Sequence, residues 1–314
     1  MKTINEIQAI TATQEYDRNF WDAMRLKPNA EIALRDALDS ITGTYFAPAA
    51  GDADLRKVIS RESVIRSLAT TLKKYHGGSV IWAADSDDHA AFVPEGAPIP
   101  GFDIQGDFTR FSVGSHKIAG LLKLNEEFAI DADFDLKKYI SERMGKTFAH
   151  TEDGAFVNGN GTDEPYGLLH DTEGAETVTA AALTYDSVID LFFAVEPEYR
   201  THATWLMNDR TALALRKLKD EAGNYLWNGS TDTILGKPVR ICNDMPDIAA
   251  GAKPVLFGDF SYYWIIDRSP VSMKALKERF AMTARVGYVA FELLDARLVR
   301  REAVKAISVT GESE

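Results

Sequence analysis

Two segments near the start of the chain have apolar residues at helical spacing. In Glu15–Met24 the large apolar side chains share one face, and Asn29–Leu38 is expected to form a second helix. The pattern is then interrupted at Gly43, Pro48 and Gly51. Two arrangements fit residues 1–57, a helical hairpin packed on the chain's own core or an exposed arm that reaches a neighbouring molecule. We expect the arm, because the segment has too little apolar content to bury itself alone.

The longest predicted helix runs from Leu136 to about Phe156. Its apolar stripe consists of Leu136, Ile140, Met144 and Phe148. Asp131, Asp133 and Asp135 precede it at alternate positions, as in a calcium loop, but Leu136 stands where such a loop needs glycine. We therefore expect Asp133 or Asp135 to cap the helix and to bind no metal.

A long stretch rich in proline, glycine and acidic residues follows the predicted strand Ser79–Trp82. A structureless loop as long as Ala83–Val113 is uncommon inside a compact domain. We expect a projecting two-stranded hairpin with strands Ala90–Val93 and Phe108–Val113, and then a strand over His116–Phe128. An isolated hairpin is only marginally stable in water, so this one needs a surface to lie on. The alternative is an ordinary flap or an active-site lid.

Short elements alternate between Thr184 and Ile266. A helix over Thr184–Ala194 turns Val188, Leu191 and Phe192 inward. The strand Ala203–Met207 is followed by a helix over Arg210–Lys219, for which we expect Asp209 as the N-cap and Leu213, Leu215 and Leu218 as apolar positions. Further strands are predicted at Tyr225–Trp227, Ile234–Ile241 (bent or at a sheet edge), Val255–Phe257 and Tyr262–Ile266.

Several motifs of this region carry a family resemblance. They are A-x-W-x-x-N at Ala203–Asn208, L-K-D-x-x-G-x-Y-L at Leu218–Leu226, L-G-x-P-V at Leu235–Val239, and then M-P, F-G-D-F-S and D-R. In this order they resemble the major capsid proteins of tailed phages with the HK97-type fold. A second match, A-F-x-N-G-x-G-T-x-x-P-x-G-L at Ala155–Leu168, resembles the family's long spine helix and the turn after it.

The resemblance implies an α+β, HK97-like capsid fold with a discontinuous peripheral domain. The expected parts are an N-terminal arm (1–57), an extended loop (83–117), an axial domain (177–285) and three pieces of the peripheral domain (58–82, 118–176 with the spine helix, and 286–314). In the family the extended loop lies across the adjacent subunit. Here the matching residues are Val93–Gly96 and Phe111–Val113.

The implied function is that of a major capsid protein. Copies of the chain would form hexamers and pentamers of an icosahedral head, located in the virion after assembly in the host cytoplasm. The shell would enclose double-stranded DNA without sequence-specific binding. Expected partners besides the chain itself are a portal protein and a scaffolding protein or protease, since no long charged helical block precedes residue 15. Encapsulins share this fold and are the first alternative, and an enzyme with a lid at 83–113 is the second.

Six residues are candidate intersubunit contacts. An exposed apolar side chain at a loop tip needs a partner. The candidates are Phe92, Glu95, Phe102, Phe108 and Arg110 of the extended loop and Trp21 of the arm.

Composition and charge are compatible with this interpretation. The chain has 314 residues and a net charge of −12, which argues against a protein that coats nucleic acid by neutralising phosphates. The single cysteine, Cys242, excludes an intrachain disulfide and is expected to be a small buried apolar group. No apolar run is long enough to cross a membrane, and no secretory signal is visible at the start.

Candidate chemistry is sparse. The six histidines show no metal-ligand spacing, His150 is expected at the surface of the spine helix, and no nucleophile motif occurs. Glu292 and Asp295 are interpreted as surface partners of Arg297 and Arg300, with little effect on stability. We therefore expect no catalytic residue, no metal site and no cofactor.

One chemical property of the family makes a direct prediction. Some capsids of this type cross-link themselves through an isopeptide bond between a lysine of the extended loop and a late asparagine. Here no lysine lies between Lys74 and Lys117, and no asparagine follows Asn243. Mature particles should therefore give only monomer on a denaturing gel. A ladder that survives boiling would contradict this.

Overall fold

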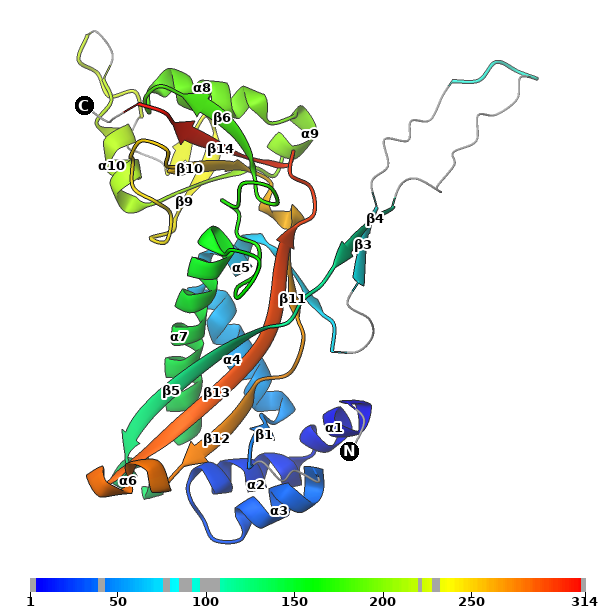
Figure 1. Cartoon of the computed structure of the whole chain (residues 1–314), viewed down its shortest axis with the longest axis vertical. Helices are drawn as coiled ribbons and strands as arrows, with labels where there is room; N and C mark the ends of the chain where they lie inside the picture. Colours follow the sequence, from blue (N-terminus) through cyan, green and yellow to red (C-terminus); the bar gives the residue numbers. More distant parts are fainter. Residues whose placement is uncertain are drawn as a thin grey trace.

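The computed structural model of the chain describes residues 4–38, 43–75, 80–84, 92–96, 108–219, 222–227 and 232–311. The molecule is elongated, with two packed bodies stacked along its longest axis and a ribbon that projects sideways from their junction (Figure 1). Helices and two six-stranded sheets form the bodies, so the predicted α+β class is confirmed.

The first body is organised around one long strand, β13 (Arg285–Leu298). β5 (His116–Asn125) pairs with its first ten residues, and β12 (Ser272–Leu276) pairs with the same stretch along the other edge. β11 (Tyr263–Asp267) continues beyond β12, and the sheet is completed by β1 (Tyr45–Phe46) and β2 (Thr70–Lys73). β5 ends three residues before the predicted Phe128, because Asn125 precedes the short helix α6 (Glu126–Ile130).

The spine helix, α7 (Leu136–Asn158), covers one face of this sheet. Its predicted stripe is confirmed, since Leu136, Ile140, Met144 and Phe148 are all buried. Close packing against β5 needs a glycine, because a Cβ on Gly120 would lie 3.0 Å from the Phe148 ring. The cap is also confirmed, as the Asp135 carboxylate accepts a hydrogen bond from the Lys138 N–H at 3.0 Å.

The N-terminal part of the chain contains the helices α1 (Ile4–Thr11), α2 (Gln14–Met24), α3 (Ala30–Leu38) and α4 (Ala49–Glu62). In the single chain α2 and α3 pack on the chain's own core, which is the first of the two arrangements considered for residues 1–57. α4 crosses the boundary expected at residue 57 and contains Gly51, so the expected break at Gly51 was wrong. A single glycine costs a helix only about 1 kcal/mol, and the buried Leu55 and Ile59 outweigh that cost.

The second body has the strand order β6-β14-β10-β7-β9-β8. Its strands are β6 (Glu176–Ala180), β7 (Thr204–Met207), β8 (Thr233–Ile234), β9 (Lys237–Ile241), β10 (Val255–Gly258) and β14 (Val304–Val309). Helices α8 (Tyr185–Ala194), α9 (Pro197–Arg200) and α10 (Asp209–Arg216) lie around this sheet (Figure 1). At its centre the rings of Trp205 and Phe257 stack with centroids 4.1 Å apart.

Several local predictions for the second body were wrong. The N-cap of α10 is Asn208, whose side chain accepts from the Thr211 N–H, and Asp209 is the first helical residue. Leu213 is exposed, and the segment predicted as the strand Tyr225–Trp227 makes only one isolated bridge. The predicted strand over Ile234–Ile241 lies at the sheet edge as expected, but it is divided into β8 and β9, because Leu235 and Gly236 both have positive φ and form a tight hairpin turn.

Strand pairing also differs from the expected division at residue 285. β11 and β12, expected in the axial part, pair with β13 beneath the spine helix. β14, expected in the last peripheral piece, instead pairs with β10 and β6 in the second sheet. Its buried residues pack against α8, so the apolar pattern of Val304–Val309 is satisfied there. The chain therefore passes between the two bodies more often than the sequence indicated.

The crossing of α4 and α7 makes a prediction that uses two glycines of the same helix. A Cβ on Gly145 would lie 2.6 Å from Cγ1 of Val58, whereas a Cβ on Gly154 would meet Asp244 only at 3.7 Å. Gly145→Ala should lower the free energy of unfolding by about 1–3 kcal/mol through overpacking. Gly154→Ala, the matched control, should raise it by about 0.5–1 kcal/mol. Urea unfolding measures both, and equal effects would contradict the proposed close crossing.

Candidate assembly surfaces

The projecting ribbon is built on two strands, β3 (Val80–Ala84) and β4 (Phe108–Ser112). They pair antiparallel, with Val80 opposite Ser112 and Ala84 opposite Phe108. The predicted partner strand Ala90–Val93 was wrong, since Phe92 and Val93 are not in a strand and residues 90 and 91 lie outside the described ones. The alternation of buried and exposed residues explains why Val80–Ala84 is the segment that pairs with β4. Ile81 and Ala83 are buried against the body, while Trp82 faces solvent.

The root of the ribbon is firmly attached to the body. Ile81, Ala83 and Val113 form a small core with Ile266 and Val299. This core fixes the direction in which the ribbon leaves the junction of the two bodies (Figure 1).

Polar contacts add to the attachment. The Arg297 guanidinium lies 5.0 Å from the ring centroid of Phe111 on β4 and 5.0 Å from that of Tyr166, and it forms an ion pair with Glu173. Asp295 accepts a hydrogen bond from the Gly114 N–H and lies 3.5 Å from Nε2 of His116. Asp295 and Arg297 therefore hold the ribbon root, and the expected exposed surface pairing of Asp295 with Arg297 and Arg300 was wrong.

The candidate contact residues of the extended loop that the structure describes are exposed to solvent. Phe92 is fully exposed, at 108% of its reference area, and Glu95, Phe108 and Arg110 are exposed as well. Phe102 lies outside the described residues. Trp21 is different, since it is partly buried in the first body, close to Gly51 and 5.8 Å beneath the Lys137 ammonium.

A second exposed apolar group lies at the end of the first body furthest from the second. Phe128 and Ile130 on α6 are exposed, and Met282 on the 3₁₀ helix η3 (Glu278–Thr283) is 99% exposed. A hollow of about 550 Å³ separates these elements and is lined by Ile130, Thr283, Ala284 and Arg285 among others. Isolated exposed apolar residues are common, but a group of them at the tip of an elongated molecule is typical of a contact surface.

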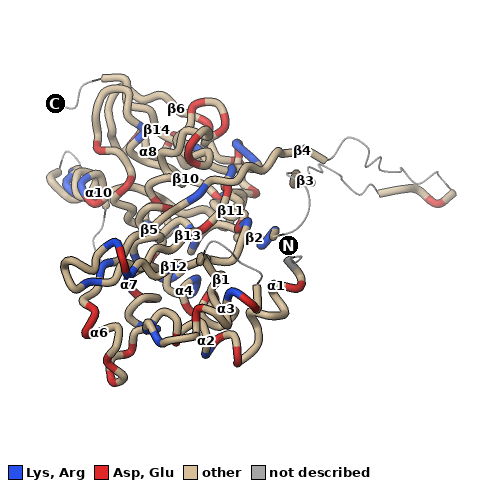
Figure 2. Tube along the Cα trace, turned by 60° about the horizontal axis from the view of Figure 1, so that its bottom comes forward, with Lys and Arg blue, Asp and Glu red and all other residues tan. Residues whose placement is uncertain are grey.

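Charged residues of both signs are interspersed along the chain trace of the two bodies (Figure 2). Two features stand out from this mixture. In the described part of the ribbon tip, residues 92–96, the charged residue is the acidic Glu95. Inside the first body, a set of charged residues is buried.

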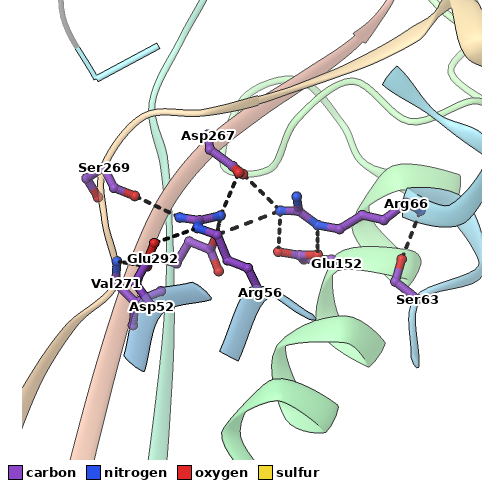
Figure 3. Close-up of polar contacts among 9 residues, drawn as sticks. All are labelled: Asp52, Arg56, Ser63, Arg66, Glu152, Asp267, Ser269, Val271 and Glu292. Atoms are coloured by element: carbon purple, nitrogen blue, oxygen red, sulfur yellow. Dashed lines mark hydrogen bonds and ion pairs between the residues drawn. The ribbon is translucent and has the colours of Figure 1, made fainter. Parts of the chain in front are cut away.

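The buried set links two helices and two strands to the spine helix (Figure 3). It comprises Asp52 and Arg56 from α4, Arg66 from α5 (Val64–Leu68), Glu152 from α7, Asp267 from β11 and Glu292 from β13. We call these six residues the buried charge cluster. Glu292 has no exposed area at all, so its predicted place at the surface was wrong.

Arg66 and Arg56 each bind more than one carboxylate. Arg66 makes a bidentate pair with Glu152, at 2.6 and 2.8 Å, and reaches Oδ1 of Asp267 at 3.1 Å. Arg56 lies 3.1 Å from Asp52, 2.9 Å from Glu292 and 2.6 Å from Oδ2 of Asp267. The last contact is an ion pair without hydrogen-bond alignment. Asp267 thus joins the two guanidinium groups.

Burial and charge shift the pKa values of this cluster. Burial raises the pKa of Glu292 to about 8, with a further contribution from the Glu152 carboxylate, and the two arginines only partly offset it. Burial also raises the pKa of Glu152 against the opposing effect of Arg66. For Arg56, burial favours a lower pKa, but Glu292 and Asp267 outweigh it and raise the value. The guanidinium groups therefore stay charged, and the carboxylates compete for them.

Groups considered for catalysis are not assembled into a site. Cys242 is buried directly after β9, and burial raises the pKa of its thiol to about 12, as expected for a small apolar group and not for a nucleophile. His150 is exposed on α7 as predicted. Among the described residues, no group of three or more His, Cys, Asp or Glu side chains is arranged to hold a metal ion. None of the described helices is long and apolar enough to span a membrane.

The architecture defines a class of protein before any comparison is made. An elongated body with an exposed apolar group at one end, and a ribbon that is anchored in a small core and exposes Phe92 completely, are typical of a subunit that packs against neighbouring molecules.

The comparisons identify the family. The model of the phage capsid family matches residues 43–309, and the chain belongs to this family. The resemblance to HK97-type major capsid proteins of tailed phages is thereby confirmed, and the chain is a structural capsid protein of the virion. A search of curated proteins found no match.

Solved capsid structures share the fold. The capsid of a native GTA particle is 27% identical, with a TM-score of 0.65 over 81% of this chain and 90% of that one. The capsid of an empty GTA particle is 28% identical, with a TM-score of 0.67 over 79% and 90%. Gordonia phage Cozz, at 14% identity, has a TM-score of 0.55 over 80% and 87%, which shows the fold alone.

The bidentate pair of Arg66 and Glu152 yields a prediction about stability. Arg66→Leu leaves Glu152 and Asp267 buried beside an apolar group, so the free energy of unfolding should fall by about 3–5 kcal/mol. Arg61→Leu is the matched control. Arg61 binds Glu62 and Glu142 at the surface, and its loss should leave the free energy of unfolding almost unchanged. Urea unfolding of the full chain tests both, and similar losses would show that the buried pair has no special weight.

Proposed function

We propose that this chain is the major subunit of an icosahedral phage head, arranged as hexamers and pentamers around double-stranded DNA. The observation that carries the proposal is the ribbon, which is rigidly rooted in the body and exposes Phe92 completely at its tip. A two-stranded ribbon is marginal in water unless it packs on something. Its partner in this proposal is the adjacent subunit, as the family resemblance implies.

The assembly is stabilised by many weak contacts in parallel. The exposed candidates of the ribbon are Phe92, Glu95, Phe108 and Arg110, and the apolar tip around Ile130 and Met282 adds a separate surface. Once one contact forms, the others become intramolecular, so their free energies add without repeated loss of translational freedom. Closed symmetry then leaves no open edge for further growth.

The division into an arm (1–57), a peripheral domain, an extended loop (83–117) and an axial domain (177–285) remains part of the proposal, with the strand exchange described above. The second body would face the axis of each hexamer or pentamer, and the tip with Met282 would lie where these rings meet. A portal protein and a scaffolding protein or protease complete the proposed partners.

The observations favour a phage shell over the two alternatives. The solved neighbours described above are phage and GTA capsids, which supports a phage-type head over an encapsulin. The described root of the ribbon leads away from both bodies, whereas a lid at 83–113 would have to cover a cleft (Figure 1).

Negative-stain microscopy of the purified chain and two variants tests the proposal. The wild type should give shells or capsomer rings. Phe92→Asp should give only small monodisperse particles, because a charge replaces the apolar tip, whereas Phe92→Leu should assemble like the wild type.

The side chain of Phe92 is fully exposed in the single chain, so neither substitution should change the unfolding transition. Small particles from the wild type would contradict the proposal. Unchanged assembly of Phe92→Asp would remove Phe92 from the contact set.

A further inference from the structure

The buried charge cluster holds more negative than positive charge. Two guanidinium groups face four carboxylates, and the cluster is sealed between α4, α5, α7 and the first sheet. A buried charge without compensation is costly, so such a site lowers its free energy by keeping a proton. Geometry indicates which carboxylate keeps it.

Oδ2 of Asp267 and Oε2 of Glu292 both lack a hydrogen-bond partner, but Oδ2 of Asp267 lies 2.6 Å from Arg56 in an ion pair, so Glu292 is the less compensated carboxylate. Its Oε1 lies 2.9 Å from Arg56 and 3.7 Å from Arg66, but Oε2 is buried without any hydrogen-bond partner. Asp52 is satisfied by Arg56 and by the Val271 N–H, and Glu152 by both N–H groups of Arg66. A neutral carboxyl at Glu292 removes the excess charge where compensation is weakest.

The groups that face Glu292 come from every element around it. They are Asp52 and Arg56 on α4, Arg66 on α5, Glu152 on α7, Asp267 on β11, and Tyr75 just after β2, whose buried hydroxyl also has no hydrogen-bond partner. From β5 the residue opposite Glu292 is the apolar Ile118. The protonation of Glu292 is therefore set mainly by the carboxylates of Glu152 and Asp267 and by the two guanidinium groups.

The cluster borders the root of the ribbon at Asp267, because the preceding residue, Ile266, belongs to the small core that holds the root. The Asp267 carbonyl accepts from the Lys74 N–H at 2.9 Å, while its carboxylate joins Arg56 to Arg66. Tyr75 is only partly buried, so the cluster comes close to solvent at this point.

We propose that Glu292 is a proton-operated latch: its neutral form holds α5, β2 and Tyr75 against the spine helix, and its ionisation opens this side of the cluster to water and loosens the root of the ribbon. The proposal concerns the single chain and does not depend on shell assembly.

The sign of the pH dependence follows from the direction of the shift. Burial raises the pKa of Glu292 above that of an unfolded glutamate, from 4.5 to about 8. Its stabilising contribution is therefore complete below about pH 4.5 and is lost as the pH rises through about 8. The latch is closed at neutral pH and opens in mildly alkaline solution.

Hydrogen exchange of the unassembled full-length chain, followed by mass spectrometry between pH 6 and 9.5, tests the latch. Rates are corrected for the intrinsic rise of exchange with pH, and residues 204–207 of the second sheet serve as an internal reference. In the wild type, protection of residues 64–75 should fall at least about tenfold between pH 6 and pH 8 and then level off, while the reference stays constant. Glu292→Gln, which imitates the neutral carboxyl, should keep its protection within about twofold. Glu142→Gln changes an exposed glutamate of α7 and should follow the wild type.

The outcomes separate clearly. A wild-type profile without a loss of protection between pH 6 and pH 8 overturns the proposal, and so does an equal loss in Glu292→Gln. Should Glu292→Gln fail to fold, Glu152→Gln replaces it. That change removes a neighbouring negative charge and frees Arg66, so the loss of protection should move to lower pH, and an unmoved transition would reject the latch.

Discussion

Burying two guanidinium groups inside a protein forces carboxylates from several elements to meet at one point. In this chain the constraint is met by Arg56 and Arg66, which gather carboxylates from α4, α7, β11 and β13. Residues as far apart as 52 and 292 thereby fix the orientation of the spine helix over the sheet. Such a cluster adds less to stability than to specificity, because each charge tolerates only one arrangement of its partners.

Next to this cluster, the ribbon has a root that is packed on the body and a tip whose apolar side chain is exposed. Ile81, Ala83 and Val113 pack the ribbon root on the body, and Arg297 binds Phe111 from the side. Beyond this root, the side chain of Phe92 is fully exposed. A rigid base with an unsatisfied tip is what a subunit needs in order to meet a neighbour in one defined geometry, since little conformational entropy is lost at the base on binding.

Much of the fold could be predicted because its periodic patterns are long. The stripe of α7 and its Asp135 cap follow directly from spacing and side-chain chemistry. The charge cluster could not be predicted, since an acidic residue at an alternate position of a strand is typical of a solvated face. Glu292 becomes recognisable only when Arg66 and Glu152, far away in the sequence, are placed beside it. The ribbon partner was missed for a similar reason, because Ile81 and Ala83 gain their burial from β11 and from the link after β13, not from local sequence.

The position of β14 has a consequence for how the subunit is made. This strand lies between β6 and β10 and supplies the pairing for both, yet it is formed by residues 304–309. While residues 304–309 are still untranslated, the second sheet of the growing chain has an open gap between β6 and β10. The second sheet can close only when translation has passed this point, so every strand of the first sheet is synthesised before the second sheet can be completed.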